Sequence, residues 1–211
     1  MANRFQIGQY TLGLAVALLS VWLWSDTAWR ADLLDVYVIF PLLGLLAFGL
    51  MWTHYIVGAL RRYLGLSRDS TASYTRATGW IVLALILLHP SLLSLGLWQD
   101  GFGLPPASYL NVYRSQSLAV ILGSLALCTF IAYELHRWWR ARSWWQFVEY
   151  AQMIAMSAIF FHGLTLGRIS GWRSAVWWGY GLTLLLAGVY TYRYDSNLKR
   201  NHHGQSASTK Q

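Results

Sequence analysis

Six long apolar stretches constrain this chain more than any other feature of its sequence. A helix needs about 20 apolar residues to cross a hydrocarbon core of about 30 Å, because each helical residue adds about 1.5 Å. Six stretches come close to that length: Gly8 to Trp24, Val36 to Leu60, Ala77 to Trp98, Ser117 to Leu135, Phe147 to Gly167 and Ala175 to Tyr192. They predict an all-α integral membrane protein that folds as a six-transmembrane-helix bundle.

The composition supports lipid as the main solvent of the chain. Only 11% of its 211 residues are charged and 56% are hydrophobic, which leaves too few charges to cover a soluble domain of this size. We expect residues 1–195 to form a single transmembrane domain and residues 196–211 to form a disordered polar tail in the cytoplasm. The stretch from Gly101 to Asn111 lacks helical periodicity, so we expect it to be a loop that caps the bundle on the non-cytoplasmic face.

The distribution of Lys and Arg predicts the orientation in the membrane. With six spans, twelve of the sixteen basic residues fall on the side of both termini and four on the other side. The richer side is cytoplasmic by the positive-inside rule, so we expect both termini in the cytoplasm. The expected location is the bacterial inner (plasma) membrane. The first apolar stretch follows only Arg4 and lacks a small-residue cleavage pattern, so we expect a first span and not a signal peptide.

Several kinds of site are excluded by the sequence. The single cysteine, Cys128, excludes an intramolecular disulfide, a covalent CxxCH haem and a multi-cysteine iron–sulfur site. There is no Walker-type phosphate loop and no GxGxxG turn after a strand. The net charge of +8 comes in short blocks between apolar runs, so no nucleic-acid partner is predicted. Glu134 and Glu149 lie near the cytoplasmic boundary, which does not fit the midplane carboxylate relay of a transporter.

Two histidines lie at similar depths in different apolar spans. His89 is roughly 16 Å beyond Thr78 and His162 is roughly 21 Å beyond Val148, on two helices that both run outward. Neutral imidazoles so placed can take the two axial positions of one b-type haem, and the iron would then be their shared metal. The alternative is that each histidine only forms a hydrogen bond to a neighbouring helix and binds no metal.

Small and helix-bending residues flank this pair of histidines. Ala155, Ala158 and Gly163 offer small surfaces near His162, where a flat cofactor would be able to approach. Pro90 follows His89 directly, and its missing backbone N–H can bend the third helix just beyond that residue.

A third histidine, His54, lies roughly 9 Å from the cytoplasmic boundary of the second span. Three roles remain open for it. It can be a ligand of a second cofactor site, a hydrogen-bond donor to a haem propionate, or a packing residue beside Thr53 and Tyr55.

Two segments of the sequence resemble the ferric reductase-like transmembrane domain family. They are ALILLH, which ends at His89, and RARSWWQFVEYAQMIAMSAIFFHG, which runs from Arg140 to Gly163. Within the family, the chain is most similar to the small haem-bearing membrane subunits that serve a periplasmic methionine-sulfoxide reductase. The resemblance implies a haem between the third and fifth helices and a role as an oxidoreductase subunit.

The chain departs from the family pattern at Glu149, where the family has a further histidine on the fifth helix. On the third helix, a second haem would need another histidine before His89. Thr75 and Arg76 occupy that position. Glutamate is not a normal axial ligand of a b-type haem, so we expect one haem in the non-cytoplasmic half and no two-haem wire. Glu149 is expected to pair with Arg140 or Arg142 instead of binding iron.

Two functions from different classes follow from these observations. The first is electron transfer to a partner or acceptor on the non-cytoplasmic side, with a quinol, a flavin or a partner's cofactor as the donor. Two roles are open for the basic cytoplasmic loops. They would bind an anionic flavin or an acidic donor protein, or they would only set the topology and contact anionic lipid. The second function is a structural or accessory subunit of a larger membrane complex, with haem kept for packing or absent. Membrane lipid and a redox partner protein are the expected partners.

Overall fold

Helices make up all the regular structure in the part of the chain that the computed structural model describes, which is residues 2–28, 35–134, 145–167 and 169–208. The elements are α1 (Ala2–Ala28), α2 (Val36–Tyr63), α3 (Asp69–Gln99), α4 (Ala107–Val112), η1 (Arg114–Gln116), α5 (Ser117–Glu134), α7 (Trp145–Leu166) and α8 (Arg173–Ser208). No strand occurs in these ranges. The predicted all-α class is confirmed for them.

Four helices in the described ranges are long and apolar enough to cross a membrane. Their apolar stretches are Asn3–Ser25, Val36–Tyr63, Asp69–Gln99 and Arg114–Tyr133. In α7 the apolar run Ala151–Leu166 is shorter, and α8 contains Trp, Tyr and Gly residues that are less apolar than Leu. The membrane character is therefore carried by four helices, while the fifth and sixth spans remain predictions.

Apolar side chains cover much of the outer surface of the helices. Leu14 on α1 is 63% exposed, Leu125 on α5 is 61% exposed and Ile154 on α7 is 72% exposed. A soluble monomer rarely exposes apolar side chains over so much of its surface. This surface fits contact with membrane lipid.

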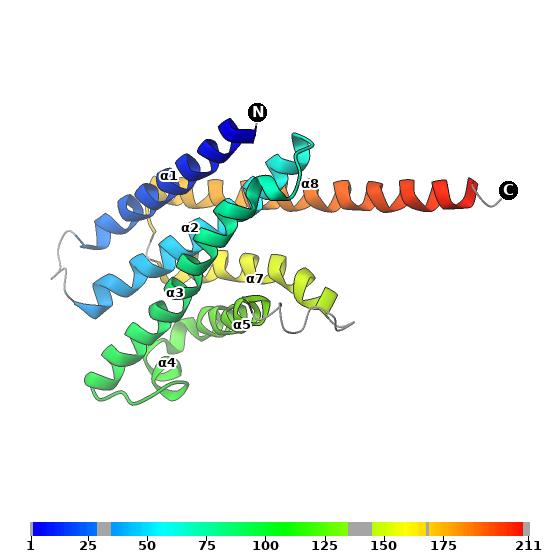
Figure 1. The fold of residues 1–211 in the computed structure, drawn as a ribbon. Helices are drawn as coiled ribbons and strands as arrows, with labels where there is room; N and C mark the ends of the chain where they lie inside the picture. The colour runs from blue at the N-terminus through cyan, green and yellow to red at the C-terminus, as the bar shows by residue number, and fades with distance from the viewer. Residues whose placement is uncertain (1, 29–34, 135–144, 168, 209–211) are drawn as a thin grey trace.

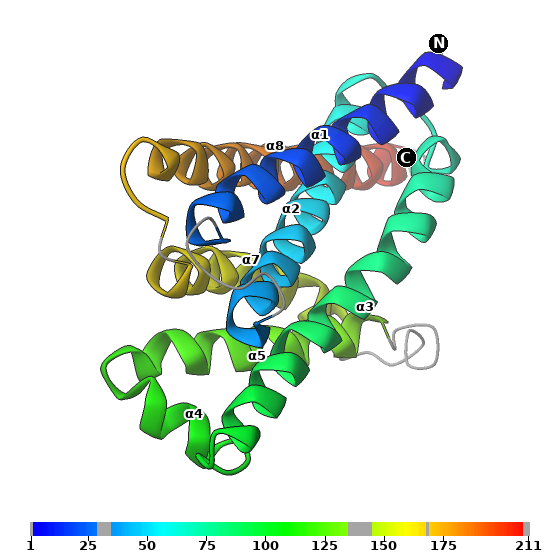
Figure 2. The same ribbon diagram turned by 90° about the vertical axis from the view of Figure 1, so that its left-hand side faces the viewer.

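Two antiparallel helix pairs form the centre of the molecule. α2 packs along α3, and α5 packs along α7 (Figure 1). Figure 2 shows α5, α7 and α8 stacked on one another, with α1, α2 and α3 crossing them at an angle. Contacts between the two pairs are few compared with those inside each pair. The space between α2–α3 and α5–α7 is where the candidate site lies.

The ends of α2 fix how it pairs with α3. The Asp35 side chain caps the start of α2 by accepting a hydrogen bond from the Tyr37 backbone N–H at 2.9 Å. The Tyr37 hydroxyl then donates to Asp100 Oδ2 at 2.6 Å, just beyond the end of α3. At the other end Gly65 has a φ of 63°, which glycine adopts without strain, and the chain turns there into α3. These contacts set which residues of α2 face the outer half of α3.

The segment from Gly101 to Asn111, where the sequence predicted only a loop, includes most of a short helix, α4. The Tyr109 hydroxyl on α4 lies 2.7 Å from the Pro90 carbonyl oxygen and 2.7 Å from Ser94 Oγ, both on α3. These contacts with α3 hold α4 in place. The local sequence pattern does not predict this short helix. α4 therefore packs against the end of α3.

The last helix, α8, extends further than the sequence predicted. It continues through residues 196–208, where we expected a disordered tail, and it projects beyond the rest of the bundle (Figure 1). No proline interrupts this segment, but Gly204 and several Asn, His and Ser residues in it have low helix propensity. Local propensity therefore does not explain why α8 continues past its apolar part.

Candidate cofactor site

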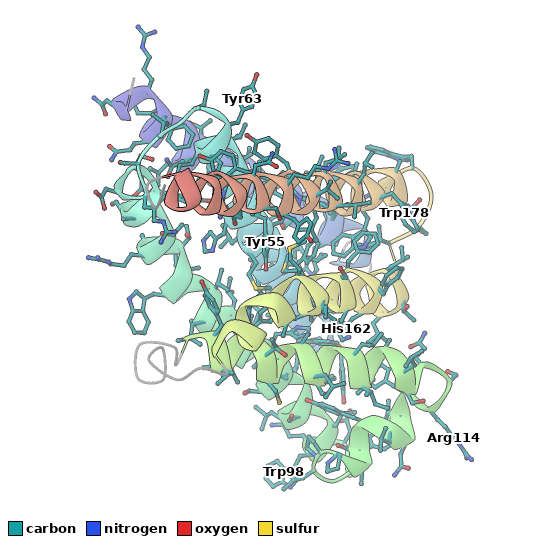
Figure 3. The ribbon with its side chains drawn as sticks, turned by 90° about the vertical axis from the view of Figure 1, so that its right-hand side faces the viewer. Tyr55, Tyr63, Trp98, Arg114, His162 and Trp178 are labelled. Atoms are coloured by element: carbon teal, nitrogen blue, oxygen red, sulfur yellow. The ribbon has the colours of Figure 1, made fainter. Side chains whose placement is uncertain are left out.

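The structure brings His89 and His162 together. His89 lies on α3 and His162 on α7, and their ring centroids are 6.3 Å apart with the ring planes inclined by 79°. Figure 3 shows His162 on the side of α7 that faces α5. The two histidines that the sequence selected by depth therefore meet between the two helix pairs.

Each of these rings is bound by a backbone carbonyl of the neighbouring helix. His89 Nδ1 lies 2.7 Å from the Phe40 oxygen on α2, and His162 Nδ1 lies 2.8 Å from the Ala119 oxygen on α5. A carbonyl oxygen only accepts hydrogen bonds, so Nδ1 carries the proton of each neutral imidazole. The lone pair is then on Nε2 in both rings, which is the form in which an imidazole binds a metal.

His54 has the opposite tautomer and a different place in the structure. Its Nε2 lies 2.6 Å from Thr78 Oγ1, and the Thr78 hydroxyl donates to the Tyr74 oxygen at 2.7 Å. Because the only hydroxyl proton of Thr78 is used in this way, His54 Nε2–H must be the donor. His54 is not among the described residues that line the cavity around His89 and His162. Its observed contact is a hydrogen bond between α2 and α3.

A cavity surrounds the two paired histidines. Its volume is about 170 Å³, and with the recess into which it opens the space free of protein atoms is about 1210 Å³. The lining is mostly apolar, and its polar members besides the two histidines include Tyr109, Tyr113 and Ser124. None of the described lining residues carries a charge. This is the lining expected for a largely apolar ligand.

An aromatic core closes one side of the cavity. The rings of Phe48 and Trp177 are 4.6 Å apart, and Phe160 stacks on Trp177 at 5.7 Å with only 10° between the planes. Trp177 Nε1–H donates to the Phe160 oxygen at 3.2 Å, which joins α8 to α7. We expected Gly163 to leave room for a cofactor, but a Cβ there would lie 2.5 Å from Trp177 Cζ2, so the indole uses much of that room.

The spacing of the two rings fits a metal bound between them. Two imidazoles on opposite sides of one metal have ring centres about 6.3 Å apart, since each metal–nitrogen bond is about 2.0–2.1 Å and each ring centre lies about 1.1 Å further on. The observed separation is 6.3 Å. Among the described residues no group of three or more His, Cys, Asp or Glu side chains gathers in one place. The donor set here is two imidazoles, and His89 and His162 are the residues that would hold the iron of a b-type haem.

Sequence reasoning missed Gly44 on α2 and Gly123 on α5, which also line the cavity. A Cβ on Gly44 would lie 2.9 Å from His89 Cε1, and a Cβ on Gly123 would lie 2.5 Å from His162 Nδ1. Nothing near either glycine in the sequence points to a histidine on another helix. The contacts become visible only once the helices are paired.

Comparison with protein-family models, with curated proteins and with solved structures found no match. The resemblance to ferric reductase-like domains therefore rests on the residues named above. The side chains of Trp145, Glu149 and Tyr150, together with Arg140 and Arg142, lie outside the described part of the structure. The pairing expected between Glu149 and these arginines stays a prediction.

Proposed function

We propose that this chain is an electron-transfer subunit of a membrane, with one b-type haem held between His89 and His162. The observation that carries the proposal is the pair of rings 6.3 Å apart whose Nδ1 atoms both face backbone carbonyls. When bound, a haem iron supplies a one-electron redox couple. Such a chain would be the haem-bearing part of an oxidoreductase.

The residues around the cavity would tune that couple in two opposing ways. The hydrogen bonds from Nδ1 to Phe40 and Ala119 strengthen electron donation by Nε2, which favours the more highly charged ferric state. The apolar lining disfavours charge and so favours the ferrous state. Both effects come from backbone and apolar side chains, so neither depends on a charged residue in the cavity.

The place of the cavity supports delivery of the electron to the non-cytoplasmic side. Tyr109 and Tyr113 line it, and both belong to the segment that the distribution of basic residues places outside the cytoplasm. A redox partner protein or a soluble acceptor on that side would approach the cavity from the side where α4 lies. The donor would be a quinol, a flavin or a partner's cofactor on the cytoplasmic side.

A structural role is the second candidate, and one observation favours it. The hydrogen bonds of His89 to Phe40 and of His162 to Ala119 join α3 to α2 and α7 to α5 without any metal. Interhelical hydrogen bonds of this kind stabilise membrane bundles by about 0.6–2 kcal/mol each. The chain would then serve as an accessory subunit of a larger complex.

A reduced-minus-oxidised absorbance spectrum of the purified protein separates these candidates. Electron transfer predicts a b-type difference spectrum that develops when a quinol or a reduced flavin is added and reverses when an acceptor is added. A haem that dithionite reduces but neither physiological type of donor reduces supports the structural role. Protein purified from haem-replete cells without any haem would reject the proposed function.

A further inference from the structure

We propose that Gly44 and Gly123 are positioning residues that set the angle and the hydrogen bond of the two histidine rings. Each glycine acts together with the carbonyl one helical turn before it. We name these two units glycine–carbonyl pockets: Phe40 O with Gly44, and Ala119 O with Gly123. Their geometry stands without a bound cofactor, while their effect on a redox potential rests on the proposed function.

The two pockets are built in the same way on two different helices. On α2 the Phe40 oxygen faces His89 Nδ1, and on α5 the Ala119 oxygen faces His162 Nδ1. In each helix the glycine follows the accepting residue by four positions, and residues so spaced lie on one helix face. Each ring therefore meets a hydrogen-bond acceptor and a gap in the side-chain surface on the same face of its neighbour.

The rings occupy the space that a side chain at the glycine would need. A Cβ on Gly44 would lie 2.9 Å from His89 Cε1 and 3.0 Å from its Nδ1. A Cβ on Gly123 would lie 2.5 Å from His162 Nδ1 and 2.7 Å from its Cε1. Non-bonded carbon atoms prefer about 3.5–4.0 Å, so an alanine would have to push the ring away from the helix.

A histidine ring has little freedom to yield to such a push. It is rigid, and its Nδ1 is already within 2.7 or 2.8 Å of the carbonyl oxygen, so displacement lengthens that hydrogen bond. Because each ring belongs to its own helix pair, moving one ring also changes the 79° angle between the two. The tighter pocket, at Gly123, should show the larger effect.

The first experiment needs no haem. In wild-type protein labelled with ¹⁵N-histidine, NMR chemical shifts should show protonated Nδ1 in His89 and His162 and protonated Nε2 in His54, with assignments from His→Ala variants. Gly44→Ala should move the Nδ1 resonance of His89 and leave that of His162 nearly unchanged, and Gly123→Ala should do the reverse. A protonated Nε2 at His89 or His162 in the wild type would contradict the proposed glycine–carbonyl pockets. This result needs only the wild type, so it holds even if neither glycine variant folds.

The second experiment measures the haem midpoint potential and the low-spin absorbance of the same variants. Gly44→Ala and Gly123→Ala should shift the potential and raise the high-spin fraction. Gly49→Ala is the matched control for crowding, because its Cβ would lie 2.6 Å from Val16 Cγ1 and touches no histidine, and Gly79→Ala has nothing within 4 Å. Both controls should match the wild type.

Two results contradict the positioning role. One is that Gly44→Ala and Gly123→Ala give wild-type NMR shifts, potential and spectrum. The other is that Gly49→Ala shifts the potential by as much as they do, which would mean general helix packing is being measured. If the wild type binds no haem, the proposed function fails, and the NMR shifts alone then decide whether the two pockets position the rings.

Discussion

At the scale of single residues, the tautomer distinguishes His54 from His89 and His162. His89 and His162 donate from Nδ1 and keep the Nε2 lone pair, whereas His54 donates from Nε2 to Thr78. Depth in the membrane and apolar flanks single out the first two in the sequence. The tautomer could not be predicted, because it depends on which backbone oxygen of another helix faces each ring.

The angle between the two rings predicts an electron paramagnetic resonance spectrum. The planes of His89 and His162 are inclined by 79°, and nearly perpendicular axial imidazoles leave two iron d orbitals close in energy. If the proposed haem is bound by both rings, the oxidised protein should give a highly anisotropic low-spin signal with one dominant low-field feature. A rhombic signal with three well-resolved features, typical of parallel ring planes, would contradict the observed ring arrangement.

Removing the hydrogen-bond partner of His54 should affect stability and not haem. In Thr78→Val the Nε2–H of His54 loses its acceptor, and an unpaired buried polar group costs about 1–3 kcal/mol. We expect an unfolding free energy lower by about 1 kcal/mol in detergent, together with wild-type haem content. The measurement is the denaturation midpoint followed by tryptophan fluorescence. Loss of haem in this variant would place His54 in the cofactor site.

At the scale of helices, the sequence predicted the long elements and missed the short ones, α4 and η1. Each of the six apolar stretches coincides with one helix, apart from Gly167, which lies just past the end of α7, and Leu135, which lies outside the described residues. The reason is that about 20 apolar residues are a strong signal for a helix in lipid. α4 was missed because Tyr109 is held by Ser94 and Pro90 of another helix, and no local pattern encodes those contacts. The contact between Gly44 on α2 and His89 on α3 was missed for the same reason.

The contact of Tyr109 with α3 predicts how firmly α4 is attached. Tyr109→Phe removes a hydroxyl that lies 2.7 Å from both the Pro90 oxygen and Ser94 Oγ, which should cost about 1 kcal/mol. We expect faster amide hydrogen exchange in residues 101–113, with exchange in the middle of α3 unchanged. Tyr63→Phe, at a side chain that is 73% exposed, is the control and should exchange like the wild type. Unchanged exchange in Tyr109→Phe would show that other contacts hold α4.

At the scale of the whole molecule, two helix pairs and an apolar outer surface define a membrane bundle with its cavity between the pairs. Four helices in the described ranges have the length and composition of membrane spans. The sequence supplies a further constraint in the arrangement of its basic residues, since twelve of sixteen fall on one side only if the number of crossings is even. The predicted orientation rests on that count, and the last two spans remain predictions from the apolar stretches.

Reporter fusions test this topology. Fusions at Gln211 and ahead of Arg4 should be active only with a reporter that works in the cytoplasm, and a fusion in the segment after Gly101 should be active only with a reporter that works outside it. The reason is that the basic segments favour the cytoplasmic side by the positive-inside rule. A terminal fusion that is active only outside the cytoplasm would reject the predicted orientation, and termini on opposite sides of the membrane would reject the even number of spans.

The most direct test of the central claim is the amount of haem per chain in three histidine variants. Purified wild-type protein should contain close to one b-type haem, and His89→Ala and His162→Ala should each contain well below one. Either substitution removes one of two imidazoles that lie 6.3 Å apart and leaves an apolar cavity unfilled. His54→Ala should keep most of its haem, because His54 bonds to Thr78 away from the cavity. His89→Ala protein with full haem occupancy and an unchanged low-spin spectrum would contradict the account.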